Sequence, residues 1–372
     1  MSTARGTPCC EHPTAHRVRQ PKTSCSVVSE RRSALRFTRV LPVLAAVVGA
    51  QFVTTSDAFA GITLNGAGFI PIAPLVLKWA DGFDVTGNTV NYAAVGDATG
   101  YQDVAGGIID FGAIDAPVQL GGVTCSGCVL VPWALSATGL GYNISGVGKG
   151  LKLNGEVLAE IYLGEITNWD SPVITELNKG VSFPHLKITP VFLGGESGDS
   201  YAFTGYLSAI NKAWAAKNGG ATSSFPGGSV GVAEQSDSAL TTEIASVNGS
   251  IGYLNVSYLA AHRVNVARVQ NAKGNYEYPD VPNIDNAASE VKSVPAGNVL
   301  SIVDPPKTYK VAYPISEFGY ALVPTGGQNA TVIQQFLTYC VTTGRSLGTG
   351  IDFAPIPSVV QTAALHAINS LS

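Results

Sequence analysis

The chain carries little charge, and beyond its first 60 residues it carries little positive charge. Charged residues make up 13% of the 372 residues, and hydrophobic residues make up 45%. Eight of the 22 Lys and Arg residues lie in the first 60 positions, so 14 basic and 23 acidic residues follow from Gly61 onward. The acidic balance argues against nucleic acid as a partner. The apolar content and the length are typical of a folded chain of roughly two domains.

Long apolar runs are absent after the N-terminal region, so no membrane span is predicted there. In that region, arginines between positions 31 and 39 precede an apolar run from Leu41 to Val53 and the small residues Ala58 and Ala60. This order is typical of a secretory signal peptide over residues 1–60, with cleavage after Ala60. A membrane anchor is the alternative, but the run is shorter than the roughly 20 residues that a span needs.

Histidine is scarce after residue 60, which limits acid–base catalysis. The three histidines, at 185, 262 and 366, lie in no recognisable general-base motif. The run Gly195-Glu-Ser-Gly-Asp199 is similar to a nucleophile elbow, but that motif requires glycine at position 199. The chain is therefore not expected to be an enzyme, with an exported phosphatase as the alternative. No cofactor and no metal are predicted, because capping or solvated carboxylates are commoner than metal-binding ones.

Cysteine is scarce as well, with Cys125, Cys128 and Cys340 after residue 60. The C-x-x-C spacing fits a redox pair or half of a zinc site, but structural zinc takes four ligands. In an oxidising compartment a local disulfide between Cys125 and Cys128 is favoured. Cys340 is then a free thiol or an alternative partner.

Short β-branched or apolar runs alternate with helix-like stretches, which is typical of an α/β protein. Strands are expected near residues 62–64, 90–93, 108–112, 135–142, 188–193, 249–253 and 313–323. Helices are expected near residues 74–80, 101–106, 156–162, 201–217 and 334–343, and residues 218–231 and 270–310 are expected to be loops or irregular.

Three glycine-rich turns, at residues 65–68, 96–100 and 194–200, connect an expected strand to an expected helix. Helix N-termini present free N–H groups and the positive end of the helix dipole, so converging turns would form an anion site without basic side chains. Each turn alone is an ordinary connector. The prediction of an anion site therefore depends on their convergence.

Motifs at several positions resemble those of PstS-type periplasmic phosphate-binding proteins, in the same order along the chain. They include Asn65-Gly-Ala-Gly68, Asp110-Phe-Gly-Ala-Ile-Asp-Ala-Pro117, Ser197-Gly198 and Asp352-Phe-Ala-Pro-Ile-Pro357. The resemblance implies a type II periplasmic binding protein fold, with one lobe at 61–133 plus 312–372 and the other at 134–311. It also implies a periplasmic monomer that captures inorganic phosphate for the permease and ATPase subunits of an ABC importer.

Carried onto this chain, the resemblance implies a set of ligand-binding positions. They are Gly68, Ile70, Asp97, Asp115, Ser197, Gly198 and Asp199. Asp115 would accept the proton of a phosphate oxygen and reject sulfate, which has no proton to donate. Ser197 and Gly198 would reach the anion through a hydroxyl and an amide.

Four positions depart from the family pattern. Ile70 replaces Thr, Asp97 replaces Ser, Asp199 replaces Thr and Leu193 replaces Arg. The lost guanidinium is a strong bidentate anion partner, and two unit charges about 4 Å apart repel by about 4 kcal/mol at an effective dielectric near 20. The departures predict weak or monoanionic phosphate binding, or a PstS fold with an altered ligand such as a cation, an amine or a neutral polar solute. Alternatively, Asp97 and Asp199 cap helices or turn outward.

Overall fold

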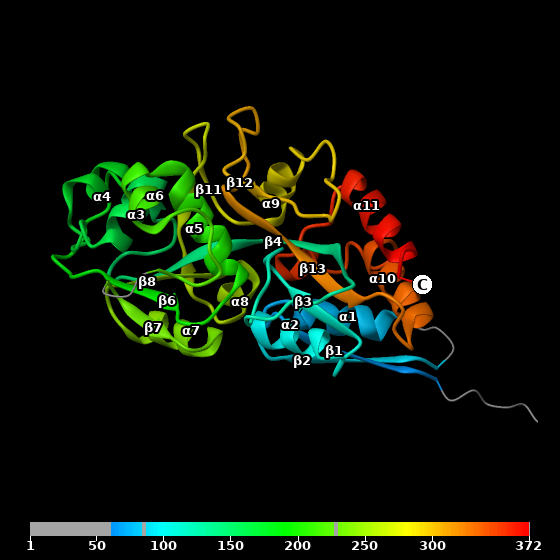
Figure 1. Cartoon of the computed structure of the whole chain (residues 1–372). Coiled ribbons are helices and arrows are strands. Elements are labelled where there is room, and N and C mark those ends of the chain that lie inside the picture. Colours follow the sequence, from blue (N-terminus) through cyan, green and yellow to red (C-terminus); the bar gives the residue numbers. More distant parts are fainter. Residues whose placement is uncertain (1–60, 84–86, 227–229, 372) are drawn as a thin grey trace, which may run out of the picture. The chain divides into compact units, whose positions relative to one another are not determined.

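The longest strand, β4 (Cys128–Asn143), is shared by two halves of a mixed sheet (Figure 1). In the computed structural model, which describes residues 61–83, 87–226 and 230–371, the strand order is β2-β1-β3-β13-β4-β8-β6-β7. Residues 128–137 of β4 pair with β13, and residues 138–143 pair with β8. The hydrogen-bonding partner of β4 therefore changes between Ala137 and Thr138.

The other strands complete this sheet and a small second one. In the main sheet they are β1 (Thr63–Gly68), β2 (Thr89–Ala94), β3 (Phe111–Ile114), β6 (Thr189–Leu193), β7 (Val232–Glu234), β8 (Ser250–Asn255), β9 (Asn265–Val266), β12 (Ile302–Val303) and β13 (Ile315–Pro324). The second sheet contains β5 (Lys152–Leu153), β10 (Arg268–Gln270) and β11 (Tyr276–Glu277). Strands β1, β2 and β3 are parallel, as are β6, β7 and β8.

Helices connect the parallel strands, because parallel neighbours need a crossover. Among them are α1 (Ala73–Gly82) after β1, α2 (Asp97–Ala105) after β2, α5 (Gly198–Ile210) after β6 and α7 (Asp237–Ser246) after β7. The others are α3 (Gly155–Leu163), α4 (Pro172–Leu177), α6 (Lys212–Asn218), α8 (Val256–Ala261), α9 (Val281–Ala288), α10 (Ala330–Val341), α11 (Ser358–Asn369) and the 3₁₀ helix η1 (Thr349–Ile351). The α/β class predicted from the sequence is confirmed.

Each half of the sheet has its own aromatic core. In the first half, the Trp79 ring lies 5.0 Å from the Trp133 ring, and the Trp79 indole donates to the Gly344 carbonyl at 2.9 Å. In the second half, the ring of Phe203 lies 4.6 Å from Tyr253 and 5.1 Å from Tyr162. Edge-to-face and offset aromatic contacts stabilise each half of the sheet beyond what the burial of apolar area alone provides.

Three segments differ from the sequence-based expectations. The helix predicted over 201–217 is two helices, because Asn211 ends α5 and caps α6. The segment 270–310 contains α9, which begins at the capping residue Asp280 with Pro282 in its first turn. The last helix is α11 rather than α10, and its Pro357 N-cap provides no side-chain capping bond. Capping residues and prolines at helix starts are short-range signals, and the spacing of apolar residues alone did not reveal where these helices begin.

Two further expectations concern the covalent structure and the N-terminal region. Cys125 and Cys128 form a disulfide, as favoured from the spacing, and Cys340 is buried as a free thiol. The predicted signal peptide over residues 1–60 lies outside the described residues. Within the described part of the chain, no helix is long and apolar enough to cross a membrane. The lobe boundaries at 133/134 and 311/312 stay a prediction.

Asn211→Ala is expected to lower the free energy of unfolding by about 1 kcal/mol, the usual loss for an N-cap side chain. Asn211 Oδ1 accepts from the Trp214 amide at 2.7 Å, and its Nδ2 donates to Glu156 at 2.6 Å. Urea unfolding measures the loss. Asn211→Ser keeps a capping acceptor without placing a second carboxylate beside Glu156, and it should retain most of the stability, whereas equal losses for both variants would show that the cap is unimportant.

Candidate functional site: a cavity ringed by strand-to-helix turns

Four strand-to-helix turns meet at one cavity of about 250 Å³. They follow β1, β2, β6 and β7, whose carboxyl ends open on the same side of the parallel segments, where α/β sheets bind ligands. The lining residues from these turns are Phe69, Ile70, Val95, Gly96, Asp97, Ala98, Thr99, Leu193, Gly195, Glu196, Ser197, Asp199, Gln235, Ser236 and Asp237. Two of the three predicted turns, at 96–100 and 194–200, meet here, together with a fourth at 235–237. Residues 65–68 lie in β1 and do not line the cavity, and the chain reaches it through Phe69 and Ile70.

Helices α2, α5 and α7 begin at the cavity, but their caps differ. Ser197 Oγ accepts from the Ser200 amide at 3.1 Å, and Ser236 Oγ accepts from the Ala239 amide at 3.2 Å. The N-cap of α2 is Gly96, which has no side chain to accept a bond. The first amides of α2 therefore keep no side-chain partner, and they are available to an anion in the cavity.

The predicted site residues divide into two groups. Ile70, Asp97, Ser197 and Asp199 line the cavity, whereas Gly68, Asp115 and Gly198 are not part of its lining. Gly68 has φ +137° and allows β1 to approach β3, because a Cβ atom there would overlap the Ala113 carbonyl.

The backbone of Gly198 lies directly against the Asp115 carboxylate. A Cβ atom at position 198 would overlap this carboxylate, so only glycine fits there. Asp115 therefore lies behind the start of α5 rather than at the cavity surface. A contact between Asp115 and the anion stays a prediction.

The alternative interpretation expected Asp97 and Asp199 to cap their helices or to turn outward, and neither residue does so. Both are buried, at 4% and 1% exposure. Asp97 Oδ1 accepts from the Asp115 amide at 2.9 Å, and Asp199 Oδ1 accepts from the Thr138 hydroxyl at 2.8 Å. Each carboxylate thus joins its helix to another element of the fold, and the cap of α5 is Ser197.

Asp237 and Glu317 were missed from the sequence. Asp237 begins α7 at the cavity, and Glu317 lies in β13 and accepts from Thr138 at 3.1 Å. A signal existed for Glu317, because it is the one charged residue in the strand Ile315–Pro324. A charge inside a buried strand is costly unless it is paired or functional.

Burial raises the pKa of five carboxyl groups in and beside the cavity. Desolvation is the main cause for Asp97, Asp115, Asp199 and Glu317, and repulsion between neighbouring carboxylates adds to the rise for Asp115, Asp199 and Glu317. Burial raises the pKa of Asp237 to about 7, with a further contribution from Asp97. The described residues that line the cavity include no lysine or arginine. Near neutral pH Asp237 is therefore a mixture of its protonated and charged forms.

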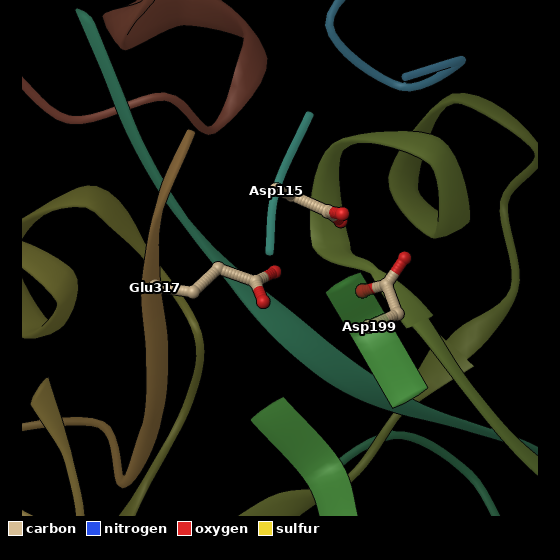
Figure 2. Close-up of side chains that lie close together, drawn as sticks. All are labelled: Asp115, Asp199 and Glu317. Carbon is tan, nitrogen blue, oxygen red and sulfur yellow. The ribbon is translucent and has the colours of Figure 1, made fainter. Parts of the chain in front are cut away.

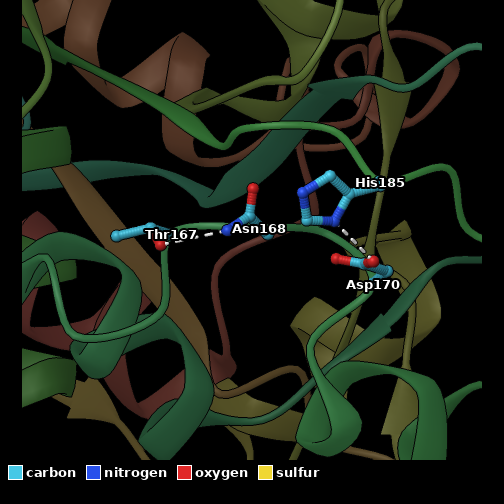
Figure 3. A network of polar contacts seen from close by, with 4 residues as sticks. All are labelled: Thr167, Asn168, Asp170 and His185. Atoms are coloured by element: carbon cyan, nitrogen blue, oxygen red, sulfur yellow. Dashed lines mark hydrogen bonds and ion pairs between the residues drawn. The ribbon is translucent and has the colours of Figure 1, made fainter.

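The Thr167–Asp170 loop lies in a separate polar network (Figure 3). His185 Nδ1 is 2.8 Å from Asp170 Oδ2, and the His185 side chain is 82% exposed. None of the residues that line the cavity is a histidine or a cysteine. His185 thus belongs to the surface rather than to the candidate site.

The profile of the PBP superfamily domain matches residues 53–343. The chain belongs to this superfamily. The phosphate-binding protein PstS of Methanocaldococcus jannaschii is 30% identical over 331 residues, covering 80% of this chain and 83% of that protein. PstS of Xylella fastidiosa (strain Temecula1) is 28% identical over 302 residues, covering 80% and 82%. The resemblance to PstS proteins is confirmed.

A solved structure shows the same fold. The phosphate-binding protein from Stenotrophomonas maltophilia superposes with a TM-score of 0.63 at 18% identity, covering 82% of this chain and 94% of that chain. The predicted type II periplasmic binding protein fold is therefore confirmed for this PBP chain.

The free energy of unfolding of the solute-free protein is expected to fall as the pH rises from about 4 to about 7. An acid whose pKa is raised on folding binds its proton more tightly in the folded chain. Its stabilising contribution is therefore present below the unfolded pKa and is lost as the pH rises through the folded pKa. For Asp237 this window extends from 3.8 to about 7.

Urea unfolding at several pH values in this window measures the fall, and Asp237→Asn should make it shallower. Carboxylates in buried ion pairs would oppose this trend, because such pairs stabilise the folded chain more as the pH rises. The two ion pairs of the described residues, Glu176–Lys179 and Asp170–His185, lie at the surface, where ion pairs contribute little. Asp285→Asn, at an exposed position on α9, is the matched control. A stability that is constant or rising over this window would contradict the assignment of buried, protonated acids.

Proposed function

We propose that this PBP chain captures inorganic phosphate in the periplasm and delivers it to the permease and ATPase subunits of an ABC importer. The cavity of about 250 Å³ at which three helices begin is the observation that carries the proposal. Helix N-termini and free backbone amides favour a small anion. The PstS relatives, which are named as phosphate-binding proteins, support the same solute. Export with cleavage after Ala60 and a monomeric state belong to this proposal.

The acids of the cavity specify the protonation state of the solute. Asp97, Asp199 and Asp237 line the cavity, and a fully ionised phosphate would be repelled by each carboxylate. The monoanion H₂PO₄⁻ carries one negative charge and two protons that carboxylates can accept. The first amides of α2 then serve its unprotonated oxygens. The proposed solute is therefore monoanionic phosphate.

We propose a binding role without catalysis. Covalent or acid–base hydrolysis needs a nucleophile paired with a general base. Ser197 Oγ is within 3.0 Å of Ser200 Oγ and accepts from the Ser200 amide, so its partners are structural. The cavity lining provides no histidine to activate it.

Phosphate affinity is expected to fall at least about tenfold between about pH 5 and pH 8, because both phosphate and the lining acids lose protons. Isothermal titration calorimetry of the full mature chain measures the change. Sulfate, which carries no proton at these pH values, should bind more weakly than phosphate at each pH. Absence of phosphate binding at every pH, up to about 10 mM, would exclude the proposed solute.

Leu193→Arg combined with Asp199→Thr is expected to increase phosphate affinity at about pH 7.5 by at least about tenfold. Leu193 ends β6 at the cavity, so an arginine there can direct its guanidinium to the solute. Leu193→Met with Asp199→Thr removes the same carboxylate without adding the guanidinium, and it separates the two effects. Equal affinity of the two double variants would show that position 193 does not contact the solute.

A further inference from the structure

Asp115, Asp199 and Glu317 bring their carboxylates together beside the cavity (Figure 2). One carboxylate oxygen of each lies within 4.8 Å of the others, and the residues are 3%, 1% and 7% exposed. They come from three distant parts of the sequence: the loop after β3, the first turn of α5 and the middle of β13. The fold therefore concentrates three potential negative charges where water is largely excluded.

The hydrogen bonds of the described residues do not satisfy this cluster. Both oxygens of Asp115 and the Oε2 atom of Glu317 are buried without a hydrogen-bond partner. The Thr138 hydroxyl lies 2.8 Å from Asp199 Oδ1 and 3.1 Å from Glu317 Oε1. A hydroxyl has a single proton, so Thr138 can donate to only one of these oxygens at a time. Buried acceptors without donors are rare in native proteins and indicate a missing partner.

We propose that Asp115, Asp199 and Glu317 form a binding site for a hard divalent cation, with Ca²⁺ as the best match. Carboxylate oxygens are the ligands that Ca²⁺, Mg²⁺ and Mn²⁺ prefer. Ca²⁺ takes several protein oxygens in flexible geometry, whereas Mg²⁺ dehydrates reluctantly and usually keeps several waters, so a buried set of three carboxylates favours Ca²⁺.

The space beside the cluster suits a single ion. A cavity of about 20 Å³ is lined by Asp115 and Glu317, together with Ser316 and Tyr201. This exceeds the roughly 10–15 Å³ needed for one water-sized particle. The two cavities share no lining residue, but Asp199 lines the larger one, so a cation held by the cluster would also contact a residue of the solute cavity. A cation here would neutralise carboxylates that otherwise repel an anion, and this coupling rests on the proposed phosphate function.

Calorimetry of the full mature chain with Ca²⁺ alone, in phosphate-free buffer after EDTA treatment, tests the cation site. Binding of Ca²⁺ is expected, with weaker binding of Mg²⁺, and Ca²⁺ should raise the melting temperature by a few degrees. Asp115→Asn and Glu317→Gln should each weaken Ca²⁺ binding at least about tenfold. Asp285→Asn, at an exposed position, should bind Ca²⁺ as the wild type does.

The thermal melts separate a lost ligand from a misfolded variant. Asp115→Asn removes a buried carboxyl group that neighbouring carboxylates repel when it is ionised, so above neutral pH and without metal it is expected to melt at or above the wild-type temperature. Its response to Ca²⁺ should be lost. No binding of Ca²⁺, Mg²⁺ or Mn²⁺ up to about 10 mM, or unchanged Ca²⁺ binding in Asp115→Asn, would overturn the cation site.

A second titration, with phosphate in the presence of EDTA or of Ca²⁺, distinguishes the two proposals. If phosphate binds in EDTA and Ca²⁺ does not bind, the cation site is wrong and the proposed solute stands. If Ca²⁺ binds and phosphate does not bind under either condition, the cation site stands and the proposed solute is wrong. Tighter phosphate binding in Ca²⁺ than in EDTA would support both proposals. The ratio of the two phosphate affinities measures the coupling free energy between the two sites.

Discussion

Among the described residues, five carboxyl groups are buried, and no lysine or arginine is buried with them. Asp97, Asp115, Asp199, Asp237 and Glu317 are at most 9% exposed, and their pKa values are all raised by burial. In a low-dielectric region such groups must be neutralised by protons, by oriented dipoles or by a bound ion. The turns supply the dipoles, because three of the acids lie in the first turns of helices that begin at the cavity.

This arrangement changes what the cavity can accept. In a site built from amides alone, helix N-termini stabilise an incoming anion. Here Asp97, Asp199 and Asp237 already bring negative charge to those N-termini, so a solute competes with the protein's own carboxylates. A solute that carries protons, or a cation that neutralises some of the carboxylates, reduces this competition. Under the proposed function, the choice of solute would therefore depend on the protons that the solute carries and on a bound cation more than on an arginine side chain.

Much of the fold and part of the site could be predicted from sequence, and the failures have physical reasons. Local turn chemistry revealed the strand-to-helix turns at Gly96 and Ser197, because glycine and serine at helix starts are short-range signals. Glu317 could not be placed beside Asp115 and Asp199, since the pairing of β13 with β3 and β4 is a long-range property of the sheet. The orientation of Asp199 toward Thr138, instead of its own helix, likewise depends on a residue 61 positions away.

The shared strand β4 limits how the two halves of the sheet can move. Its hydrogen bonds to β13 end at Ala137, and those to β8 begin at Thr138, so neither half can slide along it without breaking a ladder. Thr138, the first residue of β4 that pairs with β8, also bridges Asp199 and Glu317. The carboxylate cluster thus lies where β4 changes its partner, so any change in the twist between the two halves would move Asp199 relative to Asp115 and Glu317.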